Sequence, residues 1–198
     1  MTDARYEKFV KYLTLAQRTI EHEPESPNFH NVMNNQFRDS FFTPLELPKD
    51  ARILDIGCGS GYWMAKVRDM GYTNVTGITL NDDDIAKCTA KGLDTLKSDI
   101  SFIDLPDASV DFIWCRHVIE HSPFPLFTLM EFNRLLKKDA LMYIEVPAPD
   151  TDRKHEENAN HYSIMGEKMW INLFMRTGFE AEWSKKFEAE VTQSIDSI

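Results

Sequence analysis

The sequence predicts an α/β protein in which a mostly parallel, buried sheet carries helices on both faces. The apolar run Ile53–Ile56 is followed by three glycines at alternate positions and then, from Tyr62, by apolar residues at helical spacing, the pattern of a strand, a tight turn and a helix. Apolar and amphipathic segments then alternate along the chain. The 198 residues suffice for one domain with a sizeable core, which we expect to comprise a helical cap at 1–45 and a sheet-containing core at 46–198.

Seven apolar segments have the length and composition of strands. They lie at residues 51–56, 74–80, 93–97, 110–115, 141–146, 179–183 and 187–191. The amphipathic segments predict helices at residues 1–20, 28–42, 61–70, 82–91, 123–138 and 163–177. Gly71 and Gly178 follow two of these helices and are placed to end them, because glycine readily adopts the left-handed conformation found there.

Composition narrows the class of protein. A formal net charge of −10 argues against a broad nucleic-acid-binding surface. The sequence has no apolar run long enough to span a membrane, and its polar N-terminus does not resemble a secretory signal. Three cysteines without a C-x-x-C pair indicate reduced thiols and a cytoplasmic protein.

The glycine spacing indicates which ligand the turn accepts. In the dinucleotide pattern G-x-G-x-x-G the third glycine would stand where this chain has Tyr62. No Gly-Lys-Ser/Thr run follows, so the turn does not match a phosphate loop either. Asp55 precedes the turn and would repel a pyrophosphate. A ligand with positive charge suits this place better, and S-adenosylmethionine carries a sulfonium and an amino group but no phosphate.

The segment Asp55–Gly61 resembles motif I of the class I S-adenosylmethionine-dependent methyltransferases, and the resemblance extends over about residues 51–179. It implies a Rossmann-like, seven-stranded sheet with one antiparallel strand near its edge. It also implies methyl transfer from S-adenosylmethionine to a small or medium-sized acceptor, at oxygen or nitrogen. The cofactor-binding residues that it implies are Asp55, Gly57, Cys58, Gly59, Tyr62, Thr79, Leu80, Ser98, Asp99, Ile100, Cys115 and Arg116.

Two of these positions carry specific expectations. In the family, a carboxylate followed by a backbone amide takes the adenine, which makes Asp99 and Ile100 the adenine contacts. The second strand of the family usually ends in an acidic residue that binds both ribose hydroxyls, but this chain has Thr79 there. Asn81 and Asp82 are the alternatives for the ribose.

The segment Arg116–His121 follows the fourth strand and allows three interpretations. It resembles a stretch that shapes the pocket floor in small-molecule methyltransferases. Alternatively, His117 or His121 acts as a general base, as His161 in a later loop also could. The third interpretation is a metal-assisted O-methyltransferase, because His117, Glu120 and His121 would share one face of a helix. The first two need no metal.

Several questions stay open at the level of sequence. A protein that binds S-adenosylmethionine without turnover is one alternative, and an oxidoreductase is another that Tyr62 disfavours. Related N-terminal helices often cap the cleft, which would place Asn35, Gln36 and Arg38 at its mouth. The polar loop 150–162 is expected to overhang the cleft and contact the acceptor. Neither the acceptor nor the oligomeric state is indicated.

Overall fold

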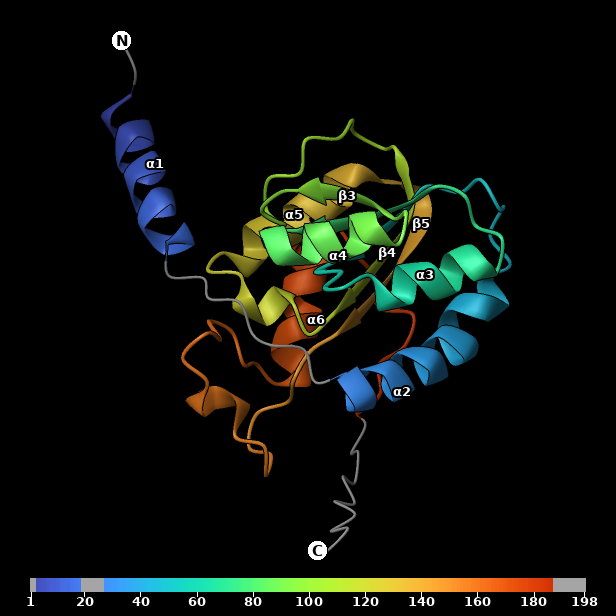
Figure 1. Ribbon diagram of the computed structural model, residues 1–198. Coiled ribbons are helices and arrows are strands. Elements are labelled where there is room, and N and C mark those ends of the chain that lie inside the picture. The colour runs from blue at the N-terminus through green and yellow to red at the C-terminus, as the bar shows by residue number, and fades with distance from the viewer. Residues whose placement is uncertain (1–2, 19–26, 187–198) are drawn as a thin grey trace, which may run out of the picture.

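The computed structural model describes residues 3–18 and 27–186 and confirms the α/β fold (Figure 1). Its sheet has the strand order β3-β2-β1-β4-β5, and every pair of neighbouring strands is parallel. The strands are β1 (Ile53–Ile56), β2 (Val75–Thr79), β3 (Asp94–Lys97), β4 (Val110–Arg116) and β5 (Leu136–Glu145). The order reverses between β1 and β4, which is where ligands bind in sheets of this kind.

Helices cover both faces of the sheet (Figure 1). They are α1 (Ala4–Gln17), α2 (Pro27–Phe37), α3 (Tyr62–Asp69), α4 (Asp82–Ala90), α5 (Pro125–Leu135) and α6 (Glu167–Arg176). The alternation of side chains along the strands sends Leu54 and Ile113 into a core shared with α5 and α6. Their neighbours Ile53 and Phe112 enter a second core, shared with α2 and α3.

A stack of three aromatic rings joins α3, β4 and β5 within the second core. The rings of Trp63 and Trp114 lie 4.7 Å apart and 10° from parallel. Trp114 in turn stacks on Tyr143, with ring centres 4.4 Å apart. The ring of Phe37, at the end of α2, lies 6.0 Å from Tyr143. These contacts attach the cap helix α2 to the sheet.

The expected helix 123–138 ends earlier than we predicted. It stops at Leu135, and Leu136 is already extended and buried as the first residue of β5. Lys137, which we expected in the last helical turn, pairs with Asp111 at 2.7 Å. The register shifts here, because Leu136 pairs with Val110 whereas Leu141 pairs with Phe112. A bulge therefore occupies the segment that the apolar pattern placed in the helix.

The last expected helix starts later than predicted, at Glu167 rather than residue 163. The backbone N–H groups of Tyr162 and Ser163 donate to the carbonyl oxygen of Glu120, at 2.7 and 3.3 Å, and this tertiary contact holds the segment outside the helix. Gly178, with φ of 88°, ends the helix as expected.

Residues 179–183, expected as a sixth strand, pair with no strand among the residues that the structure describes. After Gly178 the chain turns back, and the ring of Trp183 lies 4.4 Å from that of Phe41. The expected seventh strand, 187–191, lies outside the described residues. The five described strands are all parallel, so the expected antiparallel strand is not among them.

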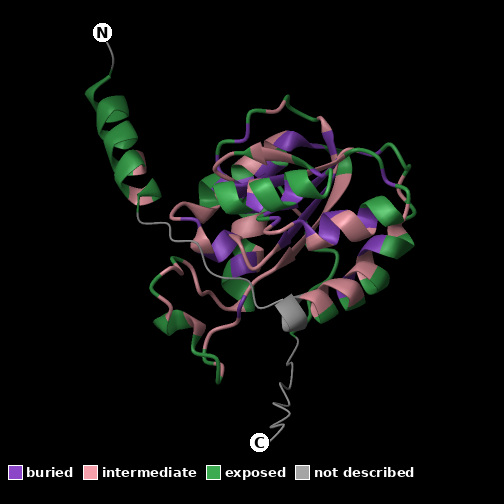
Figure 2. Cartoon of the chain, in the orientation of Figure 1, coloured by how far each residue is buried: buried purple, intermediate pink, exposed green. Residues whose placement is uncertain are grey.

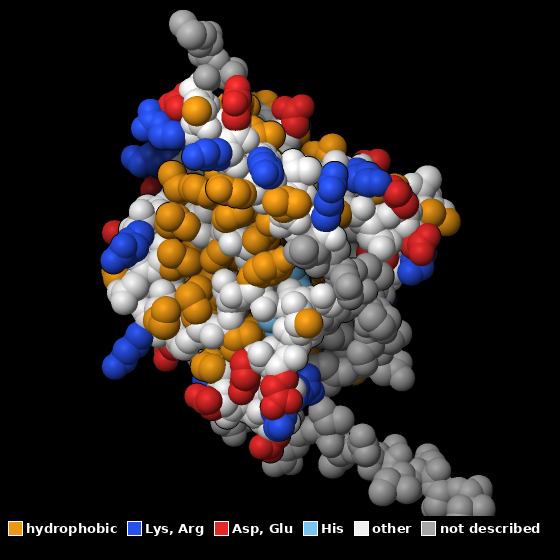
Figure 3. Space-filling model, turned by 90° about the vertical axis from the view of Figure 1, so that its left-hand side faces the viewer, with side chains coloured by type: hydrophobic (Ala, Val, Ile, Leu, Met, Phe, Trp, Pro, Cys, Tyr) orange, Lys and Arg blue, Asp and Glu red, His pale blue; other side chains and the backbone are white. Residues whose placement is uncertain are grey.

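Helix α1 lies at the side of the molecule and none of its residues is buried (Figures 1 and 2). It contacts α5 and the chain before it through Phe9, whose ring centre is 6.4 Å from that of Phe124 and 5.9 Å from that of Phe127. Apolar side chains gather on this side of the molecule (Figure 3), where Phe102 and Met130 are also exposed. Within the described ranges, no helix has the length and apolarity needed to cross a membrane.

Candidate cofactor and methyl-transfer site

The glycine turn lies at the carboxyl end of β1, where the sheet order reverses. Gly57 and Gly61 have φ values of 68° and 76°, which other residues rarely adopt. A Cβ on Gly57 would collide with the side chain of Val118, and one on Gly61 would lie 2.6 Å from Leu93 Cδ1 and 2.8 Å from Cys88 Sγ. The chain's own side chains thus fill the space beside these two glycines, a reason for glycine that the sequence did not reveal.

Three other predicted cofactor residues surround this turn. Asp55 is buried near the end of β1. The Tyr62 hydroxyl accepts a hydrogen bond from Asn35 Nδ2 at 2.8 Å, which brings α2 to the turn. Contact with Cys88 and burial both raise the pKa of the Cys58 thiol above its ordinary value, so this side chain acts as a neutral packing group.

Of the cap residues expected at the cleft, Asn35 and Arg38 lie together, because Arg38 Nη1 donates to Asn35 Oδ1 at 2.9 Å. Gln36, expected beside them, forms no side-chain hydrogen bond with the described residues.

Cys115, near the end of β4, is fully buried, and burial raises its pKa well above the ordinary value. Its thiol is therefore also neutral.

The residues considered for the ribose are already engaged. Thr79 Oγ1 accepts from the N–H of Asn81 at 3.1 Å. The side chain of Asn81 caps α4 by accepting from the N–H of Asp84 at 3.0 Å. Asp82 pairs with Lys97 at 2.6 Å. The position that is usually acidic therefore presents a hydroxyl, and the two alternative residues are occupied by structural contacts.

The predicted adenine residues form a turn after β3. The N–H of Ser98 donates to the carbonyl of the last residue of β2 at 3.1 Å, which places the turn beside the ribose position. Asp99 Oδ1 accepts from the N–H of Ser101 at 2.8 Å, so its carboxylate has a fixed orientation. Ile100 is half-buried against the core, and Leu80 is exposed.

Arg116, at the end of β4, makes three hydrogen bonds within the protein. Its Nε and Nη2 donate to the two oxygens of Glu145 at 2.7 and 2.8 Å, and its Nη1 donates to Asn34 Oδ1 at 2.8 Å. The Glu145 carboxylate also contacts the Tyr143 hydroxyl at 3.1 Å and His117 Nε2 at 2.9 Å. Burial alone would raise the pKa of Glu145, but the hydrogen bonds from Arg116 and His117 outweigh it and lower this pKa to about 2.

His117 adopts a strained backbone conformation between two carboxylates. Its φ is 52°, its N–H donates to the carbonyl of Glu145 at 2.9 Å, and its Nδ1 lies 3.5 Å from Glu120 Oε1. Burial alone would lower the pKa of His117, but the contacts with Glu120 and Glu145 raise it to about 9. An imidazolium has no free lone pair, so at neutral pH this geometry favours an electrostatic role over that of a base.

A second cluster brings together side chains that are far apart in the sequence. Glu120 and His121, in the 3₁₀ turn Ile119–His121, and His161, in the loop after β5, place one potential ligand atom each within 4.8 Å of one another. Glu120 is 1% exposed, and neither of its carboxylate oxygens accepts a hydrogen bond from the residues that the structure describes. The third interpretation of the sequence had grouped His117, rather than His161, with Glu120 and His121.

Backbone carbonyls fix the orientation of both imidazoles in this cluster. A carbonyl can only accept, so the nitrogen facing it carries the hydrogen. His121 Nδ1 donates to Asn160 O at 3.1 Å, and His161 Nδ1 donates to His155 O at 2.7 Å. The lone pair therefore lies on Nε2 of each ring. His161 Nε2 lies 3.3 Å from Asn158 Nδ2. His121 Nε2 has no hydrogen-bond partner within the described ranges.

The fold and this edge of the sheet define a class of protein: an α/β protein that binds a non-phosphorylated nucleoside cofactor at a glycine turn. Residues 32–193 match the family model described as "Methyltransferase domain", and the chain belongs to this family. This match confirms the methyltransferase family, and with it the S-adenosylmethionine cofactor, that the resemblance in motif I implied.

Individual relatives are more distant. The chain is 28% identical over 138 residues to a ubiquinone biosynthesis O-methyltransferase of Paracidovorax citrulli, covering 66% of this chain and 57% of the relative. It is 26% identical over 154 residues to a tRNA U34 carboxymethyltransferase of Mannheimia succiniciproducens, covering 66% and 46%. The chain thus spans about half the length of these two curated relatives.

Solved structures support the fold. An S-adenosylmethionine-dependent methyltransferase of Archaeoglobus fulgidus superposes with a TM-score of 0.65 at 23% identity, over 75% of this chain and 68% of that one. A second S-adenosylmethionine-dependent methyltransferase, from Mesorhizobium loti, superposes with a TM-score of 0.60 at 18% identity, over 73% of this chain and 82% of that one.

The residues at this edge fit S-adenosylmethionine at two of its three parts. Asp55 and the glycine turn suit the cationic methionine end, because the Asp55 carboxylate attracts positive charge and the turn contains no cationic side chain for a phosphate. Asp99 and the following backbone suit the adenine. The ribose position departs from the family, since Thr79 Oγ1 already accepts a hydrogen bond from the backbone.

Proposed function

We propose that the chain methylates a hydroxyl group on a small or medium-sized aromatic acceptor, with His121 as the general base. The observation that carries this proposal is the orientation of His121. Its Nδ1 is held by Asn160 O, so the lone pair of Nε2 is available at the carboxyl end of β4. The relative named as a ubiquinone biosynthesis O-methyltransferase supports oxygen as the accepting atom.

When bound, S-adenosylmethionine supplies a methyl group already activated by its sulfonium. The residues of the chain then position the acceptor, exclude water and move one proton. His121 Nε2 would accept the hydroxyl proton as the acceptor oxygen takes the methyl group from the sulfonium, whose bond to that carbon breaks; the products would be the methyl ether, S-adenosylhomocysteine and an imidazolium at His121. The buried Glu120 carboxylate beside it stabilises that positive charge. The network of Glu145, Arg116 and Asn34 holds the cap helix against this edge.

This proposal is tested by measuring S-adenosylhomocysteine formation with 3,4-dihydroxybenzoate and, for comparison, 4-aminobenzoate. We expect transfer to the first, and we expect His121→Ala to lower its rate by about 100-fold or more without changing S-adenosylhomocysteine affinity. Lys154→Ala, an exposed change in the loop before His161, is the matched control. An unimpaired His121→Ala enzyme, or transfer to the amine alone, would contradict the proposal.

A second candidate function is metal-assisted O-methylation, which the Glu120–His121–His161 cluster favours. Two neutral imidazoles with Nδ1 hydrogen-bonded to carbonyls, together with one carboxylate, form a ligand set that binds Zn²⁺ or Mn²⁺. The Glu120 oxygens lack hydrogen bonds within the described residues, and His117 Nδ1 lies 3.5 Å from Oε1, so a metal would share this carboxylate with His117. A bound metal would lower the pKa of an acceptor hydroxyl and so replace the general base.

The two candidates differ in their response to metal. If His121 is a base, a chelator leaves the rate unchanged. If the cluster holds a metal, Zn²⁺ or Mn²⁺ binds with one-to-one stoichiometry in calorimetry, and His161→Ala abolishes this binding. His155→Ala serves as the control, because His155 contributes its backbone carbonyl rather than its ring to the cluster. Absence of metal binding by the wild-type protein would exclude the second candidate.

A further inference from the structure

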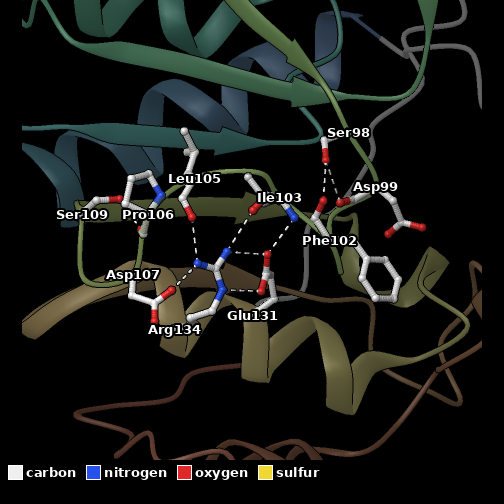
Figure 4. A network of polar contacts seen from close by, with 10 residues as sticks. All are labelled: Ser98, Asp99, Phe102, Ile103, Leu105, Pro106, Asp107, Ser109, Glu131 and Arg134. Carbon is white, nitrogen blue, oxygen red and sulfur yellow. Dashed lines mark hydrogen bonds and ion pairs between the residues drawn. The ribbon is translucent and has the colours of Figure 1, made fainter. Parts of the chain in front are cut away.

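The adenine turn, residues 98–103 after β3, is held on helix α5 at two places. Figure 4 shows the first, where the Ile103 N–H donates to Glu131 Oε1 at 2.7 Å and Arg134 Nη2 donates to the Ile103 carbonyl at 2.9 Å. Glu131 and Arg134 also pair with each other at 2.8 Å. The second place is Thr128, three residues before Glu131 on the same helix.

Thr128 belongs to a cluster of three buried hydroxyl groups. Its Oγ1 lies 2.7 Å from Ser101 Oγ and 2.8 Å from Ser122 Oγ, and these three residues are at most 5% exposed. Ser101 belongs to the adenine turn, and Ser122 directly follows His121 in the chain. The cluster therefore joins the adenine turn to the segment that carries the proposed base.

The directions of these hydrogen bonds follow from the number of hydrogens. Thr128 Oγ1 lies 3.2 Å from the Phe124 carbonyl, which can only accept. With Thr128 donating there, both serines donate to Thr128, and Ser122 Oγ accepts from the Phe124 N–H at 3.1 Å. Each hydroxyl then has a partner, as buried hydroxyl groups generally do. Thr128 is thus the shared acceptor of Ser101 and Ser122.

Each serine also holds a group of the proposed site. The Ser101 N–H donates to Asp99 Oδ1 at 2.8 Å and so orients the carboxylate that we expect to receive the adenine amino group. The Ser122 N–H donates to the Ile119 carbonyl at 3.0 Å, which closes the 3₁₀ turn that carries His121. Displacement of either serine would therefore move the group beside it.

Removal of the Thr128 hydroxyl would leave both serine hydroxyls without their shared acceptor. Ser101 Oγ and Ser122 Oγ are 3.4 Å apart, beyond the usual range of an O–H···O hydrogen bond, so they are not placed to pair with each other instead. Resting on the proposed function, we propose that Thr128 is a positioning residue that fixes Asp99 and His121 relative to each other. Because it is 0% exposed, it acts through the two serines rather than on a ligand.

The test compares Thr128→Val, which keeps the shape of the side chain, with Thr128→Ser, which keeps the hydroxyl. Calorimetry uses S-adenosylhomocysteine and its analogue with hydrogen in place of the adenine 6-amino group. The wild-type protein should bind the analogue about 10–100-fold more weakly, because one hydrogen bond to a carboxylate is lost. Thr128→Val should bind S-adenosylhomocysteine about three- to tenfold more weakly and the analogue with nearly unchanged affinity. Thr128→Ser should keep the wild-type discrimination between the ligands.

Two single variants separate this role from a general loss of structure. At saturating S-adenosylmethionine, with 3,4-dihydroxybenzoate as acceptor, Ser122→Ala should reduce kcat more than the discrimination, and Ser101→Ala should do the reverse. Thr128→Val should reduce both, with kcat lowered about three- to tenfold. Thr177→Val is the matched control, because the Thr177 hydroxyl is also buried and donates to the carbonyl four residues earlier, that of Leu173, at 3.0 Å. It should change neither quantity.

Unchanged discrimination and unchanged kcat in Thr128→Val would overturn the inference. Equal losses of both quantities in Ser101→Ala and in Ser122→Ala would overturn it as well, since a general loosening of the fold would then explain them. The same losses in Thr177→Val would have the same meaning.

The wild-type protein provides one more decisive result. If it binds the analogue as tightly as S-adenosylhomocysteine, Asp99 does not contact the amino group, and the inference is overturned. Failure of the proposed function is recognised separately, as an unimpaired His121→Ala enzyme that still distinguishes the two ligands.

Discussion

Replacing Gly57 by alanine should combine two separable costs. The first is conformational, because a φ of 68° costs a residue with a Cβ about 1–2 kcal/mol. The second is steric, since the new Cβ would collide with one methyl group of Val118 and lie 2.9 Å from the other. Overpacking of this kind costs about 1–3 kcal/mol. We therefore expect Gly57→Ala to lower the free energy of unfolding by about 2–5 kcal/mol.

A double-mutant cycle separates the two costs. Val118→Ala alone should cost about 1 kcal/mol, because it removes two methyl groups from a half-buried site. In the double variant the steric cost disappears and the conformational cost remains. The pair should therefore be less destabilised than the sum of the single variants by about 1–3 kcal/mol.

Urea unfolding followed by tryptophan fluorescence measures these free energies, and calorimetry with S-adenosylhomocysteine measures cofactor affinity in the same variants. A cost below about 0.5 kcal/mol for Gly57→Ala would refute the argument from φ. Simple additivity with Val118→Ala would refute the steric argument. Restored affinity in the double variant would show that the collision, rather than the backbone, impairs binding.

Three further predictions concern polar contacts. The pKa of Glu145 is lowered to about 2 and that of His117 is raised to about 9. The ion pair between them therefore stabilises the fold most between pH 4.5 and pH 6.5, the ordinary pKa values of the two groups. Stability is lost above this range as pH rises through 9 and below it as pH falls towards 2. We expect the wild-type unfolding free energy to drop by about 2–3 kcal/mol from pH 6.5 to 9.5. Glu145→Gln should show a smaller drop, because Glu120 alone would then raise the pKa of His117; equal slopes in urea titrations would contradict this. Arg134→Ala should lower the unfolding free energy by about 2–4 kcal/mol and weaken S-adenosylhomocysteine binding, because it frees the loop beside the adenine turn. Lys154→Ala breaks only an exposed ion pair and should cost under about 0.5 kcal/mol. Similar melting temperatures for the two variants would count against this. Tyr62→Phe should cost about 1 kcal/mol in thermal unfolding, since one link between α2 and α3 is lost, and an unchanged melting temperature would argue that this link contributes nothing.

Local sequence patterns were enough to predict the centre of the fold. The run Ile53–Ile56, the glycines and the helix from Tyr62 follow from periodicity and turn chemistry within a dozen residues. Predictions failed where a distant contact outweighed the local pattern. Residues 136–138 were predicted to end the helix, but Leu136 pairs with Val110 of β4 and these residues belong to β5.

The site shows the same division between local and distant information. The metal interpretation grouped His117, Glu120 and His121 on the assumption that the segment is helical. Instead, His117 has a φ of 52° and a 3₁₀ turn begins only at Ile119, so helical spacing does not apply. The approach of His161 depends on the path of the loop after β5, which no spacing in one sequence encodes. The hydrogen bond from Gln17 Nε2 to Asp99 Oδ2, 2.8 Å long, joins residues 82 positions apart and likewise needed the three-dimensional structure.

The aromatic stack gives this protein a built-in optical reporter. Two of the four tryptophans, Trp63 and Trp114, are nearly parallel in the stack, so their excited states couple and their near-ultraviolet circular dichroism depends on their mutual angle. Trp63 directly follows Tyr62 of the turn, and the stack ends at Tyr143, whose hydroxyl contacts Glu145. A shift between the glycine turn and the β4–β5 edge would change this signal without any attached label.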